Sequence, residues 1–201
     1  MTSEQLLPTP EGQFNIGHIC TRLQCDRGLA GKTAMRWIGP HGEQADYSFG
    51  DLERESARFA NSMQNLGFAP GDVFFIFLPK MPEVYFSFLG ALKSRLITGT
   101  LFSNFGEEAL LDRLGDAEAK GVLTRKSYLK KLLRIRDKLP SLKRILVVDA
   151  AEHEAADILS LPALLRESSC DFETPLTPGE TPSVLHYTSG STGKPKGALH
   201  H

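Results

Sequence analysis

The densest group of side chains suited to binding an anion lies near the end of the 201-residue chain, from Tyr187 to Gly197. These eleven residues contain three glycines, four serine or threonine hydroxyls and two lysines. Glycines let the backbone approach a ligand closely and adopt positive φ, so that successive N–H groups can converge on an anion. Hydroxyls add donors, and lysine adds a point charge for phosphate. The segment therefore predicts a phosphate-binding loop.

Two other interpretations of such a segment are weaker. A flexible glycine and serine linker rarely carries Lys-Pro-Lys-Gly, and an apolar, strand-like stretch at 183–187 leads directly into the loop. A Walker phosphate loop has its only near match at 26–33, which begins with Asp26 where that motif requires glycine. We interpret residues 26–33 as a turn before a strand.

The loop resembles the phosphate-binding signature of the acyl-adenylate-forming (AMP-binding) enzymes, Tyr-Thr-Ser-Gly-Ser/Thr-Thr-Gly-x-Pro-Lys-Gly. The resemblance extends from about residue 14 onward and looks closest to the bacterial acetyl-CoA synthetases (acetate–CoA ligases), chiefly through residues 185–201. The other matching segments follow in family order at 47–52, 71–73, 78–83, 89–93, 101–106, 112–114 and 117–120.

The composition limits the class of protein. A net charge of −1 argues against a nucleic-acid binder, which usually has a basic face. The three cysteines have no metal-type spacing, so free thiols in a reducing compartment are expected. Residues 1–13 lack a signal-peptide pattern, and the apolar runs are too short to span a membrane. We therefore expect a cytoplasmic protein with no membrane or nucleic-acid partner.

The order of elements predicts an α/β fold. Strands alternate with helices, which is typical of a mostly parallel sheet with flanking helices, and the ligands of such sheets lie beyond the carboxyl ends of the strands. Strands are expected at 32–38, 43–47, 73–78, 96–101, 121–124, 144–148 and 183–187. Helices are expected at 14–27, 48–66, 82–94, 106–116, 126–139 and 158–167, with an irregular surface connection at 168–181.

Two local patterns are specific enough to predict contacts. Ser48 and Asp51 have the spacing of a capping box at the start of a helix, and Gly67 is expected to end that helix. The continuous apolar run at 73–78 predicts a strand that is buried on both faces.

The resemblance implies that residues 1–201 are the N-terminal portion of the AMP-binding (adenylation) domain, ending just after the phosphate-binding loop. Family members are considerably longer, so we expect a piece of a longer protein or a truncated product. The fragment alone is expected to be inactive, because the rest of the nucleotide and acyl pockets would follow His201. An unfinished sheet would also expose apolar surface and favour self-association.

The resemblance also implies a two-step reaction. A carboxylate attacks the α-phosphate of ATP to give an acyl-adenylate and diphosphate, and the thiol of coenzyme A then takes the acyl group and releases AMP. ATP with Mg²⁺, coenzyme A, and acetate or another short carboxylic acid are the expected ligands. Residues Thr188, Ser189, Gly190, Ser191, Thr192 and Gly193 would bind the phosphates. Lys196 would pair with phosphate as the catalytic cation, and no metal-ligating residue is expected.

Several residues near the loop have competing interpretations. Lys194 lies at a variable position of the signature, so a solvated lysine is favoured. His186 either contacts the ligand site or, as the favoured alternative, is a strand histidine near the core. A metal site at His200 and His201 is not favoured. The cations at 125–138 either meet the 3′-phosphate of coenzyme A or, as favoured, form a solvated helix face.

The sequence departs from the family pattern at two places. Arg95 stands where Lys-x-Gly-Ala has glycine, and Thr100 stands where proline is common. Three functions stay open at this point: an acetate–CoA ligase piece, another short- or medium-chain acyl-CoA synthetase, and a non-catalytic product that binds phosphate or nucleotide.

Overall fold

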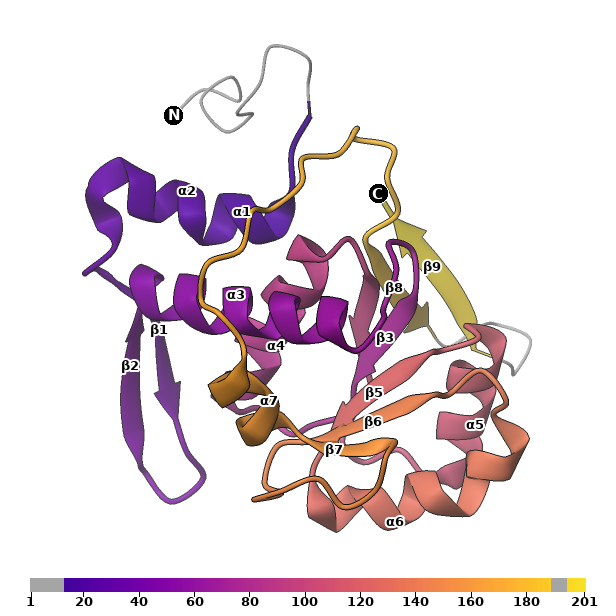
Figure 1. Cartoon of the computed structure of the whole chain (residues 1–201). Helices are drawn as coiled ribbons and strands as arrows, with labels where there is room; N and C mark the ends of the chain where they lie inside the picture. The colour runs from indigo at the N-terminus through magenta and orange to yellow at the C-terminus, as the bar shows by residue number, and fades with distance from the viewer. Residues whose placement is uncertain (1–12, 189–194) are drawn as a thin grey trace.

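The computed structural model describes residues 13–188 and 195–201 as an α/β fold built around a seven-stranded sheet (Figure 1). The strand order is β7-β6-β5-β3-β4-β8-β9, and every neighbouring pair is parallel except β8 and β9. The predicted, mostly parallel sheet is therefore confirmed. Its strands are β3 (Val73–Ile76), β4 (Ile97–Thr100), β5 (Gly121–Thr124), β6 (Arg144–Val147), β7 (Ile158–Ser160), β8 (Val184–Thr188) and β9 (Lys196–His200).

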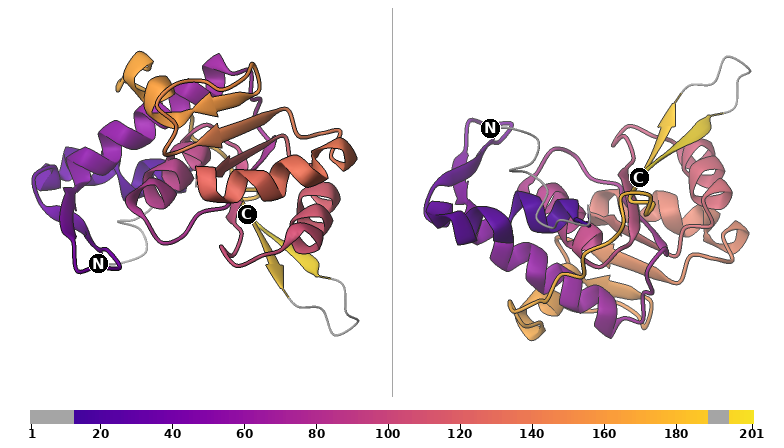
Figure 2. Two further views of the ribbon diagram at one scale, coloured as in Figure 1. Left: turned by 90° about the horizontal axis from the view of Figure 1, so that it is seen from below. Right: turned by 90° about the horizontal axis from the view of Figure 1, so that it is seen from above.

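Helices cover both faces of this sheet. One face is covered by α3 (Phe49–Asn65), α4 (Pro82–Lys93) and α7 (Leu161–Glu167), and the other by α5 (Glu107–Asp116) and α6 (Lys126–Ile135). The short helices α1 (Ile16–Cys20) and α2 (Arg22–Gln24) lie outside the first of these layers, against α4 and α3. A separate antiparallel hairpin consists of β1 (Thr33–Ile38) and β2 (Gln44–Ser48). In both views of Figure 2 the β8–β9 hairpin projects away from the layered body. No helix among the described residues is both long and apolar enough to cross a bilayer.

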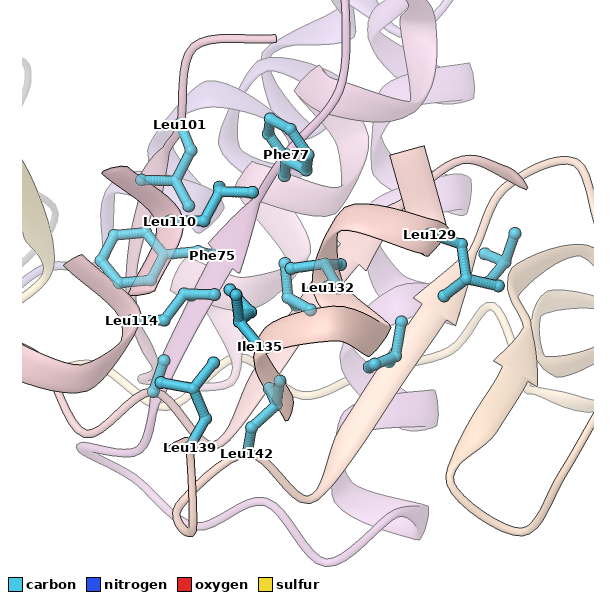
Figure 3. Close-up of a cluster of buried hydrophobic side chains, with 14 of the residues drawn as sticks. Phe75, Phe77, Leu101, Leu110, Leu114, Leu129, Leu132, Ile135, Leu139 and Leu142 are labelled. Atoms are coloured by element: carbon cyan, nitrogen blue, oxygen red, sulfur yellow. The ribbon is translucent and has the colours of Figure 1, made fainter. Parts of the chain in front are cut away.

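The central strand β3 supplies buried side chains to both layers, as predicted for the run at 73–78. Phe74 and Ile76 pack with α3, α4 and α7, whereas Phe75 and the following Phe77 pack with α5 and α6 (Figure 3). Successive side chains of a strand point to opposite faces, and all four of these are essentially inaccessible to solvent. Each fully buried aromatic or aliphatic side chain contributes about 1.5–3 kcal/mol, so this strand anchors both helical layers.

The predicted capping box begins α3. Ser48 Oγ accepts a hydrogen bond from the Asp51 N–H at 3.1 Å, and Asp51 Oδ2 accepts from the Ser48 N–H at 2.9 Å. The Asp51 carboxylate accepts bonds from the Ser48 N–H, from the Ser48 hydroxyl at 2.7 Å and from the Arg54 guanidinium, and these lower the pKa of Asp51 to about 2. Gly67 follows the helix with φ of 78°, which a residue with a side chain rarely adopts. Both ends of this helix therefore match the prediction.

The predicted helix at 14–27 is interrupted. Thr21 leaves helical geometry at φ −128° and ψ −85°, and its hydroxyl donates to the Gly17 carbonyl at 2.6 Å. Gly17 lies against α4 so closely that an added Cβ would be 2.6 Å from the Leu89 carbonyl oxygen. The side chain of Lys93 also lies against Gly17 and is fully buried. Its ammonium bonds the Glu53 carboxylate of α3 at 2.5 Å, and burial lowers the pKa of Lys93. Close packing on α4 therefore fixes the position of α1.

Two expectations for secondary structure are wrong. Residues 158–160 form strand β7, which pairs with β6, and the helix begins only after Ser160, whose Oγ accepts from the Ala163 N–H at 3.1 Å. The signature places Lys196 in the loop, but this residue begins strand β9, which pairs along its whole length with β8. Both strands are short and depend on a neighbouring strand, so local sequence does not reveal them.

Arg95 has a backbone conformation that explains why glycine is usual at this position. Its φ is 61°, in the left-handed region. The Arg95 N–H bonds the Leu92 carbonyl, and the Leu96 N–H bonds the Ala91 carbonyl, each at 3.0 Å. This pattern ends α4 with a residue that must turn left-handed, for which glycine is normally used. The side chain of Arg95 therefore imposes strain at the end of α4.

We predict that Arg95→Gly raises the free energy of unfolding by about 1 kcal/mol, because a left-handed residue with a Cβ costs roughly 1–2 kcal/mol. The neighbouring Ser94 has φ of −78°, so Ser94→Gly is the matched control and should destabilise the protein. Urea denaturation of the three proteins measures the difference. Destabilisation by both substitutions would contradict the strain at Arg95.

Candidate phosphate-binding site

The predicted phosphate-binding loop connects the two strands of an antiparallel hairpin. Thr188 is the last residue of β8 and Lys196 is the first residue of β9, and these two residues are partners in the strand register. The Thr188 hydroxyl lies 3.5 Å from the Lys196 carbonyl oxygen, and both side chains are exposed. The hairpin therefore brings two of the predicted site residues together at the base of the loop.

The other predicted site residues, Ser189, Gly190, Ser191, Thr192 and Gly193, lie outside the described residues. Their assignment to phosphate stays a prediction from sequence. The described part of the site is its base, at the carboxyl end of β8. This is the end of a parallel strand at which open α/β sheets bind ligands.

Strand β8 is attached to the main sheet only near its start. The single register pair between β4 and β8 is Thr98 with Val184, and the Thr98 N–H donates to the Ser183 carbonyl at 3.0 Å. One residue later, a Cβ on Gly99 would be 2.1 Å from the Leu185 carbonyl oxygen. Glycine is needed there, because any side chain would push β8 away from β4.

Tyr187 attaches the far end of β8 to helix α5. Its hydroxyl donates to Asp116 Oδ2 at 2.6 Å. Its ring contacts the buried Phe75 with centroids 6.2 Å apart, and the Arg113 guanidinium carbon is 5.8 Å from the ring centroid. Partial burial, followed by the hydrogen bond to Asp116, raises the pKa of Tyr187 well above its ordinary value. The phenol therefore keeps its proton and remains a hydrogen-bond donor at physiological pH.

A cavity of about 240 Å³ opens beside Tyr187. Phe102 and Phe105 meet edge to face at 5.3 Å, and the Arg113 guanidinium stacks over Phe105 at 4.2 Å. Phe102 is 70% exposed, which is unusual for such a large apolar side chain. The cavity is lined by Thr100, Leu101, Phe102, Phe105, Arg113, His186 and Tyr187. It combines aromatic surface, a cation and an imidazole at the carboxyl ends of β4 and β8.

The favoured interpretation of His186 as a residue near the core is wrong. Its side chain is exposed and lines the cavity, with its ring 5.7 Å from the ring of His200 on the paired strand. His201 contacts Glu180 at 3.7 Å. Within residues 13–188 and 195–201, no three histidine, cysteine, aspartate or glutamate side chains come together as a metal site would require.

The basic side chains at 125–138 are largely engaged with their surroundings. Arg134 bonds Glu107 at 2.8 Å, and the Lys131 ammonium donates to the Phe105 carbonyl at 2.9 Å. At the start of α6, the Lys126 ammonium pairs with Glu154 at 3.8 Å. The arrangement agrees with the favoured solvated helix face, whose apolar side is buried.

The Walker-like segment at 26–33 is not a phosphate loop. Residues Cys25–Leu29 form a π-helical turn, and β1 begins at Thr33. A Walker loop instead follows a strand and opens a helix. The interpretation as a turn before a strand is therefore confirmed.

The side chains that support the site from α5 are absent from the residues predicted by sequence. Asp116 and Arg113 lie about seventy positions before Tyr187 in the chain, so their contact depends on the fold. One signal is present in the sequence, namely a carboxylate at the last residue of a predicted helix. A negative charge is unfavourable at that end of a helix dipole, so such a residue often has another partner.

Comparison with known proteins defines the class of protein to which this hairpin and sheet belong. A family model described as "AMP-binding enzyme" matches residues 23–201. The chain belongs to this family, and the resemblance noted from the loop signature is confirmed.

Individual relatives are acetyl-coenzyme A synthetases. That of Bacillus subtilis (strain 168) is 39% identical over 155 residues, which cover 77% of this chain and 27% of the relative. That of Deinococcus radiodurans is 30% identical over 204 residues, covering 94% of this chain and 31% of the relative. The chain therefore spans about a third or less of the length of these relatives.

Solved structures share the fold. An acyl-CoA synthetase from Brucella canis superimposes with a TM-score of 0.84 at 27% identity, over 97% of this chain and 35% of that one. The anthranilate CoA ligase AuaEII, solved with anthranoyl-AMP, gives a TM-score of 0.82 at 23% identity, over 100% of this chain and 36% of that one. At that identity the second likeness extends to the fold alone.

Proposed function

We propose that this chain supplies the phosphate-binding part of an ATP-dependent acetate–CoA ligase. The reaction joins acetate and coenzyme A through acetyl-adenylate and releases AMP and diphosphate. The observation that carries the proposal is the hairpin of β8 and β9, which brings Thr188 and Lys196 together at the base of the signature loop. Membership of the AMP-binding enzyme family and the acetyl-coenzyme A synthetase relatives support acetate as the acid.

The chemistry asked of these residues is to neutralise charge on the departing diphosphate. Pre-aimed donors and cations do this most effectively. The exposed Lys196 ammonium would pair with a phosphate oxygen, and the Thr188 hydroxyl would donate to another. In this proposal the backbone N–H groups of Gly190 to Gly193 and the hydroxyls of Ser189, Ser191 and Thr192 surround the β- and γ-phosphates.

Mg²⁺ would arrive bound to the phosphates of ATP, and would not occupy a separate site formed by protein side chains. No three potential ligands cluster among the described residues, and Mg²⁺ in nucleotide sites commonly takes much of its coordination from phosphates and water. Coenzyme A is the acyl acceptor in the same proposal.

The relatives are more than three times as long as the segment they share with this chain, so we propose that the chain alone binds diphosphate without completing adenylation.

The first experiment combines two assays on the 201-residue chain with Mg²⁺. We expect calorimetric binding of diphosphate but no acetate-dependent exchange of labelled diphosphate into ATP. Exchange with acetate would overturn the proposed inactivity, whereas exchange only with longer acids would favour another acyl-CoA synthetase. A chain that does not bind diphosphate would refute the assignment of the loop.

Lys196 is predicted to carry much of the phosphate affinity. Lys196→Ala should weaken diphosphate binding about ten- to a hundredfold, because a charge-assisted bond contributes about 1.5–3 kcal/mol. In a catalytically complete protein with the same loop, the equivalent loss of transition-state stabilisation should be about 2–4 kcal/mol. Lys194→Ala is the matched control and should change the dissociation constant by less than about twofold. Equal effects of the two substitutions would argue against a special role for Lys196.

Self-association is proposed through β9. Within the described residues this strand pairs only with β8, all five of its residues are exposed, and Leu199 is 46% exposed. An open strand edge with an apolar side chain is a template for pairing with another chain. Sedimentation should detect dimers or larger species that Leu199→Lys reduces, whereas a monodisperse wild-type monomer with cooperative unfolding would exclude this association.

A reducing, cytoplasmic location is proposed from the thiols. Cys20, Cys25 and Cys170 are all free, as is usual for thiols in a reducing compartment. Alkylation in intact cells before lysis should trap all three as free thiols. Recovery of an oxidised pair would contradict this location.

A further inference from the structure

We propose that Asp116 of α5 is a positioning residue, which fixes Tyr187 and thereby the base of the phosphate-binding loop. This inference rests on the proposed function and adds a residue that the loop signature does not contain. The bond from the Tyr187 hydroxyl to Asp116 Oδ2 is 2.6 Å long, short enough for a charge-assisted hydrogen bond.

The need for such an anchor follows from how β8 is paired. Its first residue, Val184, has a register partner in β4, and its remaining residues have register partners only in β9. The outer half of the hairpin therefore leaves the main sheet before it reaches the loop. Figure 2 shows the hairpin projecting in this way. Tyr187 lies in that outer half, one residue before Thr188, and reaches back to the body of the protein.

The anchor fixes both strands of the hairpin. The Tyr187 ring contacts the buried Phe75 of β3. Gly197 of β9 is the register partner of Tyr187, and a Cβ added there would be in ordinary contact with the ring at 3.5 Å. Since Gly197 follows Lys196 directly, the tyrosine ring sets the position of both residues at the base of the loop.

The location of Asp116 indicates that its carboxylate is not there to stabilise α5. It is the last residue of that helix, where the dipole disfavours a negative charge by typically about 0.3–1 kcal/mol. The Tyr187 hydroxyl supplies a compensating donor, and the Arg113 guanidinium packs between the rings of Phe105 and Tyr187. Asp116 is unfavourable for its own helix but bonds a segment of the proposed site, and this combination is typical of a residue that supports a site.

The test measures the affinity of the 201-residue chain for inorganic diphosphate by calorimetry, at a temperature where circular dichroism reports every variant as folded. Tyr187→Phe keeps the ring and removes the donor, and Asp116→Ala removes the acceptor. Each should raise the dissociation constant about three- to tenfold, the range expected for one lost hydrogen bond. Asp116→Asn keeps a carbonyl acceptor and should recover most of the affinity.

Tyr128→Phe is the matched control, because this tyrosine packs its ring on Phe77 of the same core at 5.1 Å but belongs to α6. It should leave the dissociation constant within about twofold of wild type, whatever its effect on the melting temperature. Unchanged affinity in Tyr187→Phe and Asp116→Ala, or an equal loss in Tyr128→Phe, overturns the inference alone. A wild-type chain that does not bind diphosphate overturns the proposed function and this inference with it.

Discussion

The whole architecture depends on burying both faces of strand β3. Phe74 and Ile76 on one face, and Phe75 with the following Phe77 on the other, are almost completely removed from water. Neither face can be exposed without losing several kcal/mol of hydrophobic stabilisation, so helices must cover both. The parallel strands on either side of β3 satisfy its backbone groups. A mostly parallel sheet with helices on both of its faces is the result.

The candidate site lies at the edge of the sheet, where the regular pairing of parallel strands ends. Strand β8 adds to the sheet beside β4, where Gly99 allows a backbone approach that no side chain could tolerate. Beyond that point the chain leaves the sheet as a hairpin, and side-chain contacts replace backbone pairing. Tyr187 bonds Asp116 and contacts Phe75, so the loop base is tied to a core helix and to the central strand. A phosphate site gains from such support, because donors held in place cost little reorganisation when charge develops.

Features with a local signal could be predicted from the sequence. The Ser48 and Asp51 capping box, the helix stop at Gly67 and the apolar run of β3 each involve residues within a few positions of one another. Features that a partner strand decides could not. Residues Ile158–Ser160 are a strand because they pair with β6, and Lys196–His200 are a strand because they pair with β8. The position of His186 escaped prediction for a related reason, since its exposure depends on which face of β8 the core covers.

The amino-acid sequence by itself determined the family and the α/β class and predicted the phosphate-loop residues, because each is written in contiguous segments whose spacing carries the chemistry. The tertiary structure alone decided the rest. It brought Asp116 and Arg113 to Tyr187, opened the aromatic cavity beside them and set Thr188 opposite Lys196. Such contacts join residues separated by many positions, and their existence depends on the order of strands in the sheet. No local pattern specifies that order, because it results from burying every strand and helix at once.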